Sequence, residues 1–154
     1  FVTKAGAKIS SLTEPTKKMS KSDPNENGYI LLLDPIDAVV RKIKRAVTDS
    51  GSAVKRGEGK EGIMNLMSIY GAFTGKTSDE IEREFDGKGY GDFKAAVGEA
   101  CADALAPVQS EYARLVADKA YLESIMKKGA AEAAHDAMVT MSKVRRKIGF
   151  TDIR

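Results

Sequence analysis

Lysine and serine side chains are concentrated in one short segment near the start of the chain, T-K-K-M-S-K-S, which is seven residues long. Lys17, Lys18 and Lys21 carry compact positive charges on flexible stems, which suit phosphate oxygens that move during a reaction. Ser20, Ser22 and the backbone N–H groups of a loop would supply further hydrogen-bond donors to the same oxygens. The segment therefore predicts a phosphate-binding loop, and the alternative is a basic loop that contacts only solvent.

The same segment is not expected to enter the hydrophobic core. Pro15 precedes it and Pro24 follows it, and the residues between them show neither the apolar spacing of a helix nor the alternation of a strand. A loop of this composition cannot bury its side chains. Its charges must therefore face solvent or a ligand.

A second pattern resembles a phosphate-binding P-loop, because residues 71–77 read G-A-F-T-G-K-T. The pattern is one residue short, since Tyr70 occupies the place of the first glycine. It also follows a predicted helix, whereas the true motif follows a strand and opens a helix. We therefore expect Gly75 to end a helix and do not assign a nucleotide site to this segment.

Composition limits the other kinds of site. The chain has 154 residues, of which 42% are hydrophobic and 31% charged, as in ordinary folded domains. Cys101 is the only cysteine and His135 the only histidine, which argues against an internal disulfide and a zinc site. The longest apolar run, Ile30–Leu33, is too short to span a membrane. We expect no metal ligands from this chain and a reducing compartment, the cytosol.

The net charge of +3 is distributed unevenly along the chain. Residues 1–60 carry a net charge of +5, residues 61–110 carry −5, and residues 111–154 carry +3. Two basic ends around an acidic middle predict a polyanionic partner that binds particular faces of the molecule. The alternative is a scatter of solvated charges without a partner.

The spacing of apolar residues predicts a mainly helical chain with an irregular beginning. In residues 1–33 we expect only a strand near 7–12 and a buried strand or helical turn at 29–33. From Asp34 onward, apolar residues recur every three or four positions, which predicts a bundle of five or six helices.

Local signals predict where these helices begin and end. Asp34 is expected to cap the first helix, which would end near Thr48 before an exposed loop at 49–60. Thr77 and Glu80 are expected to form a capping box. The other helices are expected over 63–75, 77–85, 93–115 with a kink at Pro107, and 122–126 and 133–148 on either side of an interruption at Gly129.

Beyond these physical arguments, residues 18–22 spell K-M-S-K-S, the signature loop of class I aminoacyl-tRNA synthetases. A fixed pattern of this kind is far more specific than a loose glycine pattern. Three further stretches resemble bacterial tryptophanyl-tRNA synthetases: A-V-T-D-S at 46–50, G-I-M-N-L at 62–66 and G-K-G-Y-G-D-F-K at 87–94. The likeness runs from about residue 5 to residue 149.

The resemblance implies an activity and a set of site residues. The complete enzyme of this family uses ATP and Mg²⁺ to activate tryptophan as the adenylate and then transfers tryptophan to tRNA(Trp). Lys18 and Lys21 would be the catalytic residues, contacting the triphosphate and stabilising the departing pyrophosphate. The implied ATP site also includes the backbone of Ile9, facing the adenine ring, and the loop residues Met19, Ser20 and Ser22.

The resemblance also implies a division of the chain. Residues 1–33 would be the C-terminal edge of a Rossmann-like catalytic domain, and residues 34–154 a helical domain that grips the tRNA anticodon. The second class I signature, H-I-G-H, is absent from the sequence, and His135 lies within the last helical pattern. We therefore expect the C-terminal part of a synthetase, inactive alone because half of its active site is missing, from an enzyme that forms homodimers.

Two alternatives stay open at this point. A tyrosyl-tRNA synthetase would share the same plan, although the stretches at 46–66 and 87–94 look closer to the tryptophan enzyme. A non-catalytic RNA-binding module could use the basic clusters at 41–45, 55–56 and 143–147, although none is interleaved with aromatic residues. Salt-dependent tRNA binding without ATP binding would favour the module.

Overall fold

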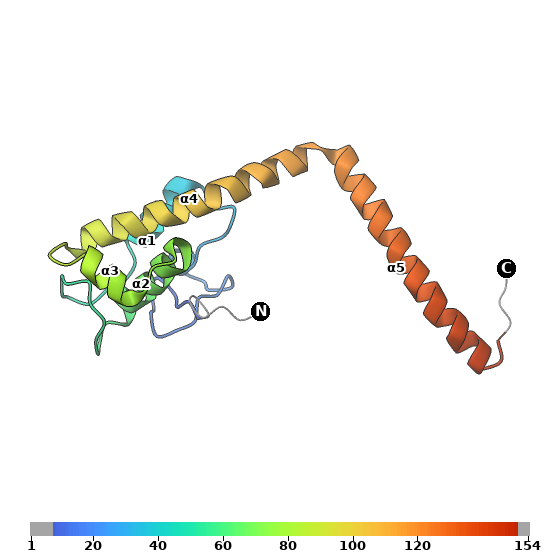
Figure 1. Cartoon of the computed structure of the whole chain (residues 1–154), viewed down its shortest axis with the longest axis horizontal. Helices are drawn as coiled ribbons and strands as arrows, with labels where there is room; N and C mark the ends of the chain where they lie inside the picture. The colour runs from blue at the N-terminus through green and yellow to red at the C-terminus, as the bar shows by residue number, and fades with distance from the viewer. Residues whose placement is uncertain (1–7, 151–154) are drawn as a thin grey trace. The chain divides into compact units, whose positions relative to one another are not determined.

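A computed structural model of the chain describes residues 8–150, and these residues form helices joined by loops, without a strand (Figure 1). The mainly helical class predicted from the sequence is confirmed. The chain divides into two compact units, Phe1–Gln109 and Ser110–Arg154. No helix within residues 8–150 is long and apolar enough to cross a membrane. The elements are η1 (Glu26–Gly28), α1 (Ile36–Lys44), α2 (Glu61–Thr74), α3 (Ser78–Glu84), α4 (Tyr90–Ala117) and α5 (Lys119–Lys147).

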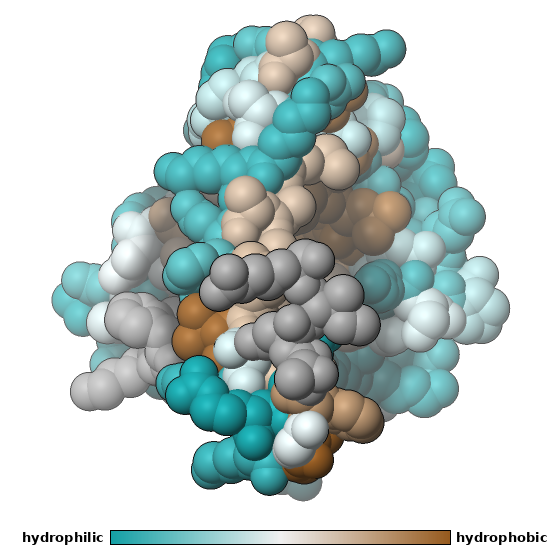
Figure 2. All heavy atoms as spheres, turned by 90° about the vertical axis from the view of Figure 1, so that its right-hand side faces the viewer, coloured by the Kyte–Doolittle hydropathy of each residue, from teal (hydrophilic) through white to brown (hydrophobic). Residues whose placement is uncertain are grey.

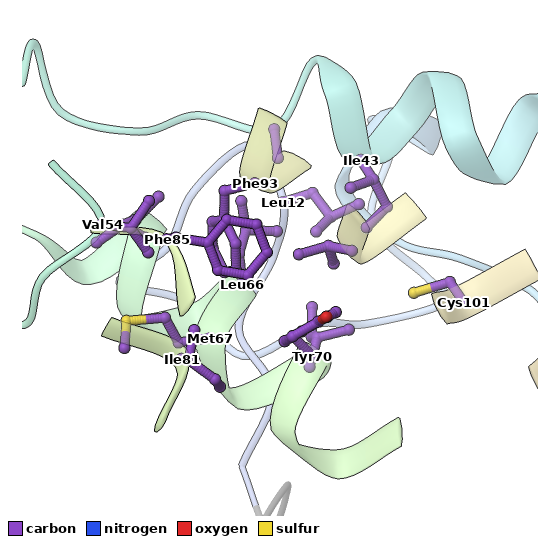
Figure 3. Close-up of a cluster of buried hydrophobic side chains, with 14 of the residues drawn as sticks. Leu12, Ile43, Val54, Leu66, Met67, Tyr70, Ile81, Phe85, Phe93 and Cys101 are labelled. Carbon is purple, nitrogen blue, oxygen red and sulfur yellow. The ribbon is translucent and has the colours of Figure 1, made fainter. Parts of the chain in front are cut away.

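The first unit is built around an apolar cluster to which α1, α2, α3 and α4 all contribute (Figure 3). Three aromatic rings lie within it, and the ring centroids of Phe85 and Phe93 are 4.9 Å apart in an edge-to-face arrangement. Tyr70 makes similar edge contacts to both rings. Leu12 and Val54 reach the same cluster from loops, so the core also fixes segments that have no regular structure.

The first helix is shorter than predicted at both ends. Asp34 does not cap α1, because its Oδ2 atom accepts hydrogen bonds from Leu31 N at 3.1 Å and Lys42 Nζ at 2.7 Å. At the other end, the backbone N–H of Val47 donates to the carbonyl of Leu12 at 2.7 Å. This contact draws the chain away from the helix, so α1 ends at Lys44 and the Val47 side chain is exposed.

Several local signals predicted the remaining helix ends correctly. Gly75 has a φ of 73° and ends α2, with its N–H donating to the carbonyl of Gly71. Thr77 and Glu80 form the predicted capping box at the start of α3. Most of the loop at 49–60 is exposed as expected, although Val54 is buried and Asp49 and Lys60, at its two ends, are half-buried.

Two predictions for the irregular beginning of the chain are wrong. Residues 8–12 form no strand, and Ala7 lies outside the described residues; Ser10 forms an isolated antiparallel bridge with Lys18 instead. The expected burial of 29–33 is not found either: Tyr29 and Ile30 are only half-buried, and Leu31, Leu32 and Leu33 are 44%, 64% and 51% exposed. Here the backbone turns, with Asp34 N donating to the carbonyl of Leu31, and the three side chains lie on the surface.

In the second unit, which also includes the end of α4, one long helix, α5, replaces the two helices predicted over 122–126 and 133–148. Gly129 lies inside α5 and does not interrupt it, because one glycine costs a helix only about 1 kcal/mol and its neighbours are good helix formers. No described residue of α5 is buried, so its apolar side chains do not join a bundle core. Figure 2 shows apolar side chains at the surface between hydrophilic ones. The exposed apolar side chains of α5 include Leu122, Ile125, Met126, Met138, Met141 and Val144.

Candidate functional site

The lysine loop, residues 16–25, lies alongside the backbone of residues 9–11, which precede it in the chain. Met19 N donates to the carbonyl of Ile9 at 3.0 Å, and Ser10 and Lys18 form the antiparallel bridge. Ile9 and Met19 were both expected at the site, and the structure brings their backbones together. The sequence did not indicate this backbone pairing. It places the lysine loop beside the backbone of Ile9 and Ser10.

The three lysines differ in their partners. Lys17 Nζ lies 2.5 Å from Glu14 Oε2, and its hydrogen bond to Glu14 raises the pKa of Lys17. Lys18 and Lys21 are exposed, and within residues 8–150 neither ammonium group has an ion pair or a hydrogen bond. The structure therefore leaves the charges of Lys18 and Lys21 available to an anion and occupies that of Lys17.

The two loop serines are close to each other. Ser20 Oγ and Ser22 Oγ are 2.9 Å apart, and Ser22 N donates to Ser20 Oγ at 3.3 Å. Asp23 N closes the turn by donating to the carbonyl of Ser20. Because one hydroxyl proton serves the contact between the serines, the other remains for an acceptor outside the chain.

An apolar hollow of about 220 Å³ lies under the loop. Ile9 and Met19 are half-buried at one side, and the buried Ile69 and Leu105 contribute to the same lining. The Met19 side chain thus connects the charged loop to the core. In the sequence, the indication of this role was that Met19 is the one apolar residue in T-K-K-M-S-K-S. The hollow is lined by Ile9, Met19, Ile30, Leu32, Ile69, Ala72, Phe73, Cys101 and Leu105.

Asn65 on α2 was not singled out from the sequence. Its Oδ1 atom accepts from Ser10 N at 2.8 Å, and its Nδ2 atom donates to the carbonyl of Ser10 at 2.8 Å. Its side chain is buried with the residue 7% exposed. The sequence feature that could have identified Asn65 is a polar residue within the apolar helical run G-I-M-N-L.

Other candidate groups are not arranged for chemistry. Burial raises the pKa of the Cys101 thiol to about 11, so it is a neutral thiol near pH 7 and a poor nucleophile. In the P-loop-like segment, Lys76 Nζ donates to both carboxylate oxygens of Glu84 at 2.8 Å. Lys76, which precedes α3, is therefore paired with Glu84 at the end of α3.

The described residues do not offer a protein cage for Mg²⁺. Proteins usually hold this ion with one or two carboxylates together with the phosphates of a substrate. Asp23 is the one carboxylate in the lysine loop, and its Oδ1 atom accepts from Asn25 N at 2.8 Å. Residues 8–150 contain no cluster of three or more metal-ligating side chains. We therefore assign no protein ligand of Mg²⁺.

Comparison with known proteins gives a consistent result. The family model described as tRNA synthetases class I (W and Y) matches residues 3–106. The tryptophan–tRNA ligase of Clostridium tetani is 47% identical over 150 residues, which is 97% of this chain and 44% of that protein. This chain therefore spans less than half the length of that relative.

Solved structures support the same relationship. The tryptophanyl-tRNA synthetase of Mycoplasma pneumoniae matches with a TM-score of 0.75 and 30% identity, covering 97% of this chain and 45% of that chain. The tryptophanyl-tRNA synthetase of Campylobacter jejuni, solved with ADP and tryptophan, matches with a TM-score of 0.70 and 25% identity, covering 92% and 44%. The helical arrangement of this chain is thus similar to part of each of these structures.

Proposed function

Because the chain belongs to the class I tRNA synthetases of the tryptophan and tyrosine group, we propose that it is the C-terminal part of a tryptophan–tRNA ligase. The complete protein would activate tryptophan with ATP and transfer it to tRNA(Trp). The observation that carries this proposal is the K-M-S-K-S loop, in which Lys18 and Lys21 have ammonium groups without partners in the described chain. Alone, the chain would hold half of an active site and be inactive.

In this proposal the two lysines act on the triphosphate of ATP. Negative charge builds on the pyrophosphate as its bond to the α-phosphate breaks, and two flexible ammonium groups can follow and stabilise that charge. The free hydroxyl proton of the Ser20–Ser22 pair would donate to another phosphate oxygen. Mg²⁺ would enter the site bound to ATP and share the neutralisation of the phosphates.

The backbone of Ile9 and Met19 would hold the other end of the nucleotide. Their mutual hydrogen bond fixes two adjacent stretches of backbone beside the apolar hollow, which suits a flat, apolar base with polar edges. The Campylobacter jejuni structure with ADP supports a nucleotide as the ligand class. We therefore place the adenine ring at Ile9 and Met19 and the phosphates at Lys18 and Lys21.

We further propose the division of labour along the chain that the resemblance implies. Residues 1–33 would complete the catalytic domain, and residues 34–154 would bind the tRNA anticodon, with the basic clusters at 41–45 and 143–147 contacting phosphates. The complete enzyme would act in the cytoplasm as a homodimer.

The proposal is tested by replacing lysines of the loop in the complete protein that carries this chain. Tryptophan-dependent exchange of pyrophosphate into ATP should fall about 100-fold or more for Lys18→Ala combined with Lys21→Ala. Lys17→Ala is the matched control, because Lys17 is paired with Glu14, and its rate should stay within a few-fold of the parent. A normal exchange rate in the double variant would refute the proposed function.

A further inference from the structure

We propose that Asn65 is a positioning residue for the lysine loop, holding it from the helix α2 through the backbone of Ser10. This inference rests on the proposed function, because it assigns the purpose of the contact to nucleotide binding. Asn65 lies outside the K-M-S-K-S signature. It is 40 positions further along the chain than Asn25, the last residue of the lysine loop.

The first argument is the geometry of the Asn65 side chain. Its carboxamide makes two hydrogen bonds of 2.8 Å to the N–H and the carbonyl of the same residue, Ser10. A pair of bonds in this arrangement fixes the position and the orientation of the peptide groups on both sides of Ser10. Because Asn65 is buried, the pair is shielded from competing water, so each bond is worth more than an exposed one.

The second argument is the path from Ser10 to the loop. The residue before Ser10, Ile9, accepts the hydrogen bond from Met19, and Ser10 itself is bridged to Lys18. Asn65 is therefore linked to the first two residues of the signature, Lys18 and Met19, by one intervening segment. If Ser10 moved, Lys18 and Met19 would lose the backbone against which they are held.

The third argument is the remaining anchorage of this segment. Ser11 N donates to the carbonyl of Lys17 at 2.8 Å, and Leu12 N donates to the carbonyl of Gly28 at 3.0 Å. These bonds join the segment to the loop and its continuation. Leu12 is also held to the core, by its buried side chain and by the hydrogen bond from Val47 N. Asn65 adds a contact from a core helix to Ser10 itself.

Asparagine suits this position for chemical reasons. Leucine has a similar shape but no hydrogen-bonding groups, so it would leave the N–H and the carbonyl of Ser10 without these partners. Aspartate would keep the acceptor for Ser10 N, and because burial favours its neutral form, its protonated oxygen can still donate to the carbonyl of Ser10. We therefore expect a graded series, with Asn65→Leu the more severe change and Asn65→Asp the milder.

The inference is tested first on the chain itself by amide hydrogen exchange. In Asn65→Leu the amides of Ser10 and Met19 should exchange at least tenfold faster relative to core amides such as that of Val97. The matched control is Met67→Ala, which removes a buried side chain from the same helix and keeps the Asn65 side chain that binds Ser10, so all amides should change together. Equal changes at Met19 and Val97 in Asn65→Leu would overturn the inference.

A second measurement connects the contact to nucleotide binding. In the complete protein, Asn65→Leu should raise the KM for ATP about tenfold and leave the KM for tryptophan unchanged, with Asn65→Asp in between. If Lys18→Ala lowers pyrophosphate exchange while both Asn65 variants keep the parent KM for ATP, the inference fails and the proposed function stands. If the lysine variants also leave pyrophosphate exchange unchanged, the proposed function fails, and the inference fails because it rests on that function. Should Asn65→Leu not fold, the Asn65→Asp results decide.

Discussion

The hydroxyl of Tyr90 donates a 2.7 Å hydrogen bond to Asp49 Oδ2, although the two residues are 41 positions apart. Lys60 Nζ donates to the same hydroxyl at 3.0 Å. The contact joins the stretch A-V-T-D-S to G-K-G-Y-G-D-F-K, so two of the motifs that carried the family resemblance meet in space. Tyr90 therefore fixes both ends of the exposed loop 49–60 against the start of α4.

Removing the Tyr90 hydroxyl should destabilise the first unit. Tyr90→Phe keeps the ring and deletes the hydrogen bonds to Asp49 and Lys60, so the free energy of unfolding should fall by about 1 kcal/mol. Urea denaturation measures this change. Tyr121→Phe on α5 is the control, since the 8–150 structure shows no hydrogen bond from its hydroxyl, and its stability should equal that of the parent.

The same contact predicts how stability depends on pH. The hydrogen bond from Tyr90 is the largest influence on the pKa of Asp49. Together with the hydrogen bond from Gly51 N and the positive charge of Lys60, it outweighs the effect of burial and lowers that pKa. Because the unfolded chain binds the proton more readily, this stabilisation is fully present above the ordinary aspartate pKa of about 3.9 and is lost as the pH falls through the lower folded value. Urea midpoints measured from pH 7 down to pH 2.5 should therefore fall less steeply in Tyr90→Phe than in the parent. Parallel curves for the two proteins would contradict this assignment.

The predictions that succeeded depend on residues close together in sequence. Gly75 ends α2, and Thr77 with Glu80 begins α3, because a left-handed glycine and a capping box need only a few neighbouring residues. The identity of residues 18–22 similarly located the loop. The pairing of Lys17 with Glu14 also spans only three positions, but it was not predicted, and only the structure distinguishes Lys17 from the other two lysines.

The predictions that failed depend on contacts between distant residues. Asp34 looked like a helix cap, yet it binds Lys42 eight positions along the chain. Residues 29–33 were expected to form a buried strand or helical turn, but their burial depended on whether the rest of the fold would cover them. The pairing of Asn65 with Ser10 spans 55 positions, and no local pattern specifies it. Apolar spacing thus predicted the helices of this chain but could not predict which loop backbone each helix would hold.

The backbone at Gly62 packs closely against the backbone of residues 47–48, whereas the space beside Gly91 is open. Replacement by alanine should therefore have opposite effects on stability at these two glycines. A Cβ atom at Gly62 would clash with the carbonyl oxygen of Val47 and lie 3.1 Å from Thr48 Cα. Gly62→Ala should therefore lower the free energy of unfolding by about 2 kcal/mol, because backbone must shift to admit the methyl group. Gly91→Ala is the control in the first turn of α4, where nothing lies within 4 Å, and it should be neutral or stabilising by up to about 1 kcal/mol. Thermal unfolding followed by circular dichroism distinguishes the two, and equal melting temperatures would rule out the close approach.

The helix α5 provides a test of stability that does not depend on a core. Since none of its described residues is buried, its stability must come from intrinsic helix propensity and from pairs such as Glu123 with Lys127 at 3.6 Å. Gly129 is the weakest position in its interior, and a Cβ atom there would meet nothing within 4 Å. Gly129→Ala should therefore stabilise α5 by about 1 kcal/mol, seen as higher ellipticity at 222 nm on warming and slower amide exchange in α5 alone. If Gly129→Ala instead lowered helicity, the residue would be packed closely against a partner, and α5 would not be the self-supporting helix described above.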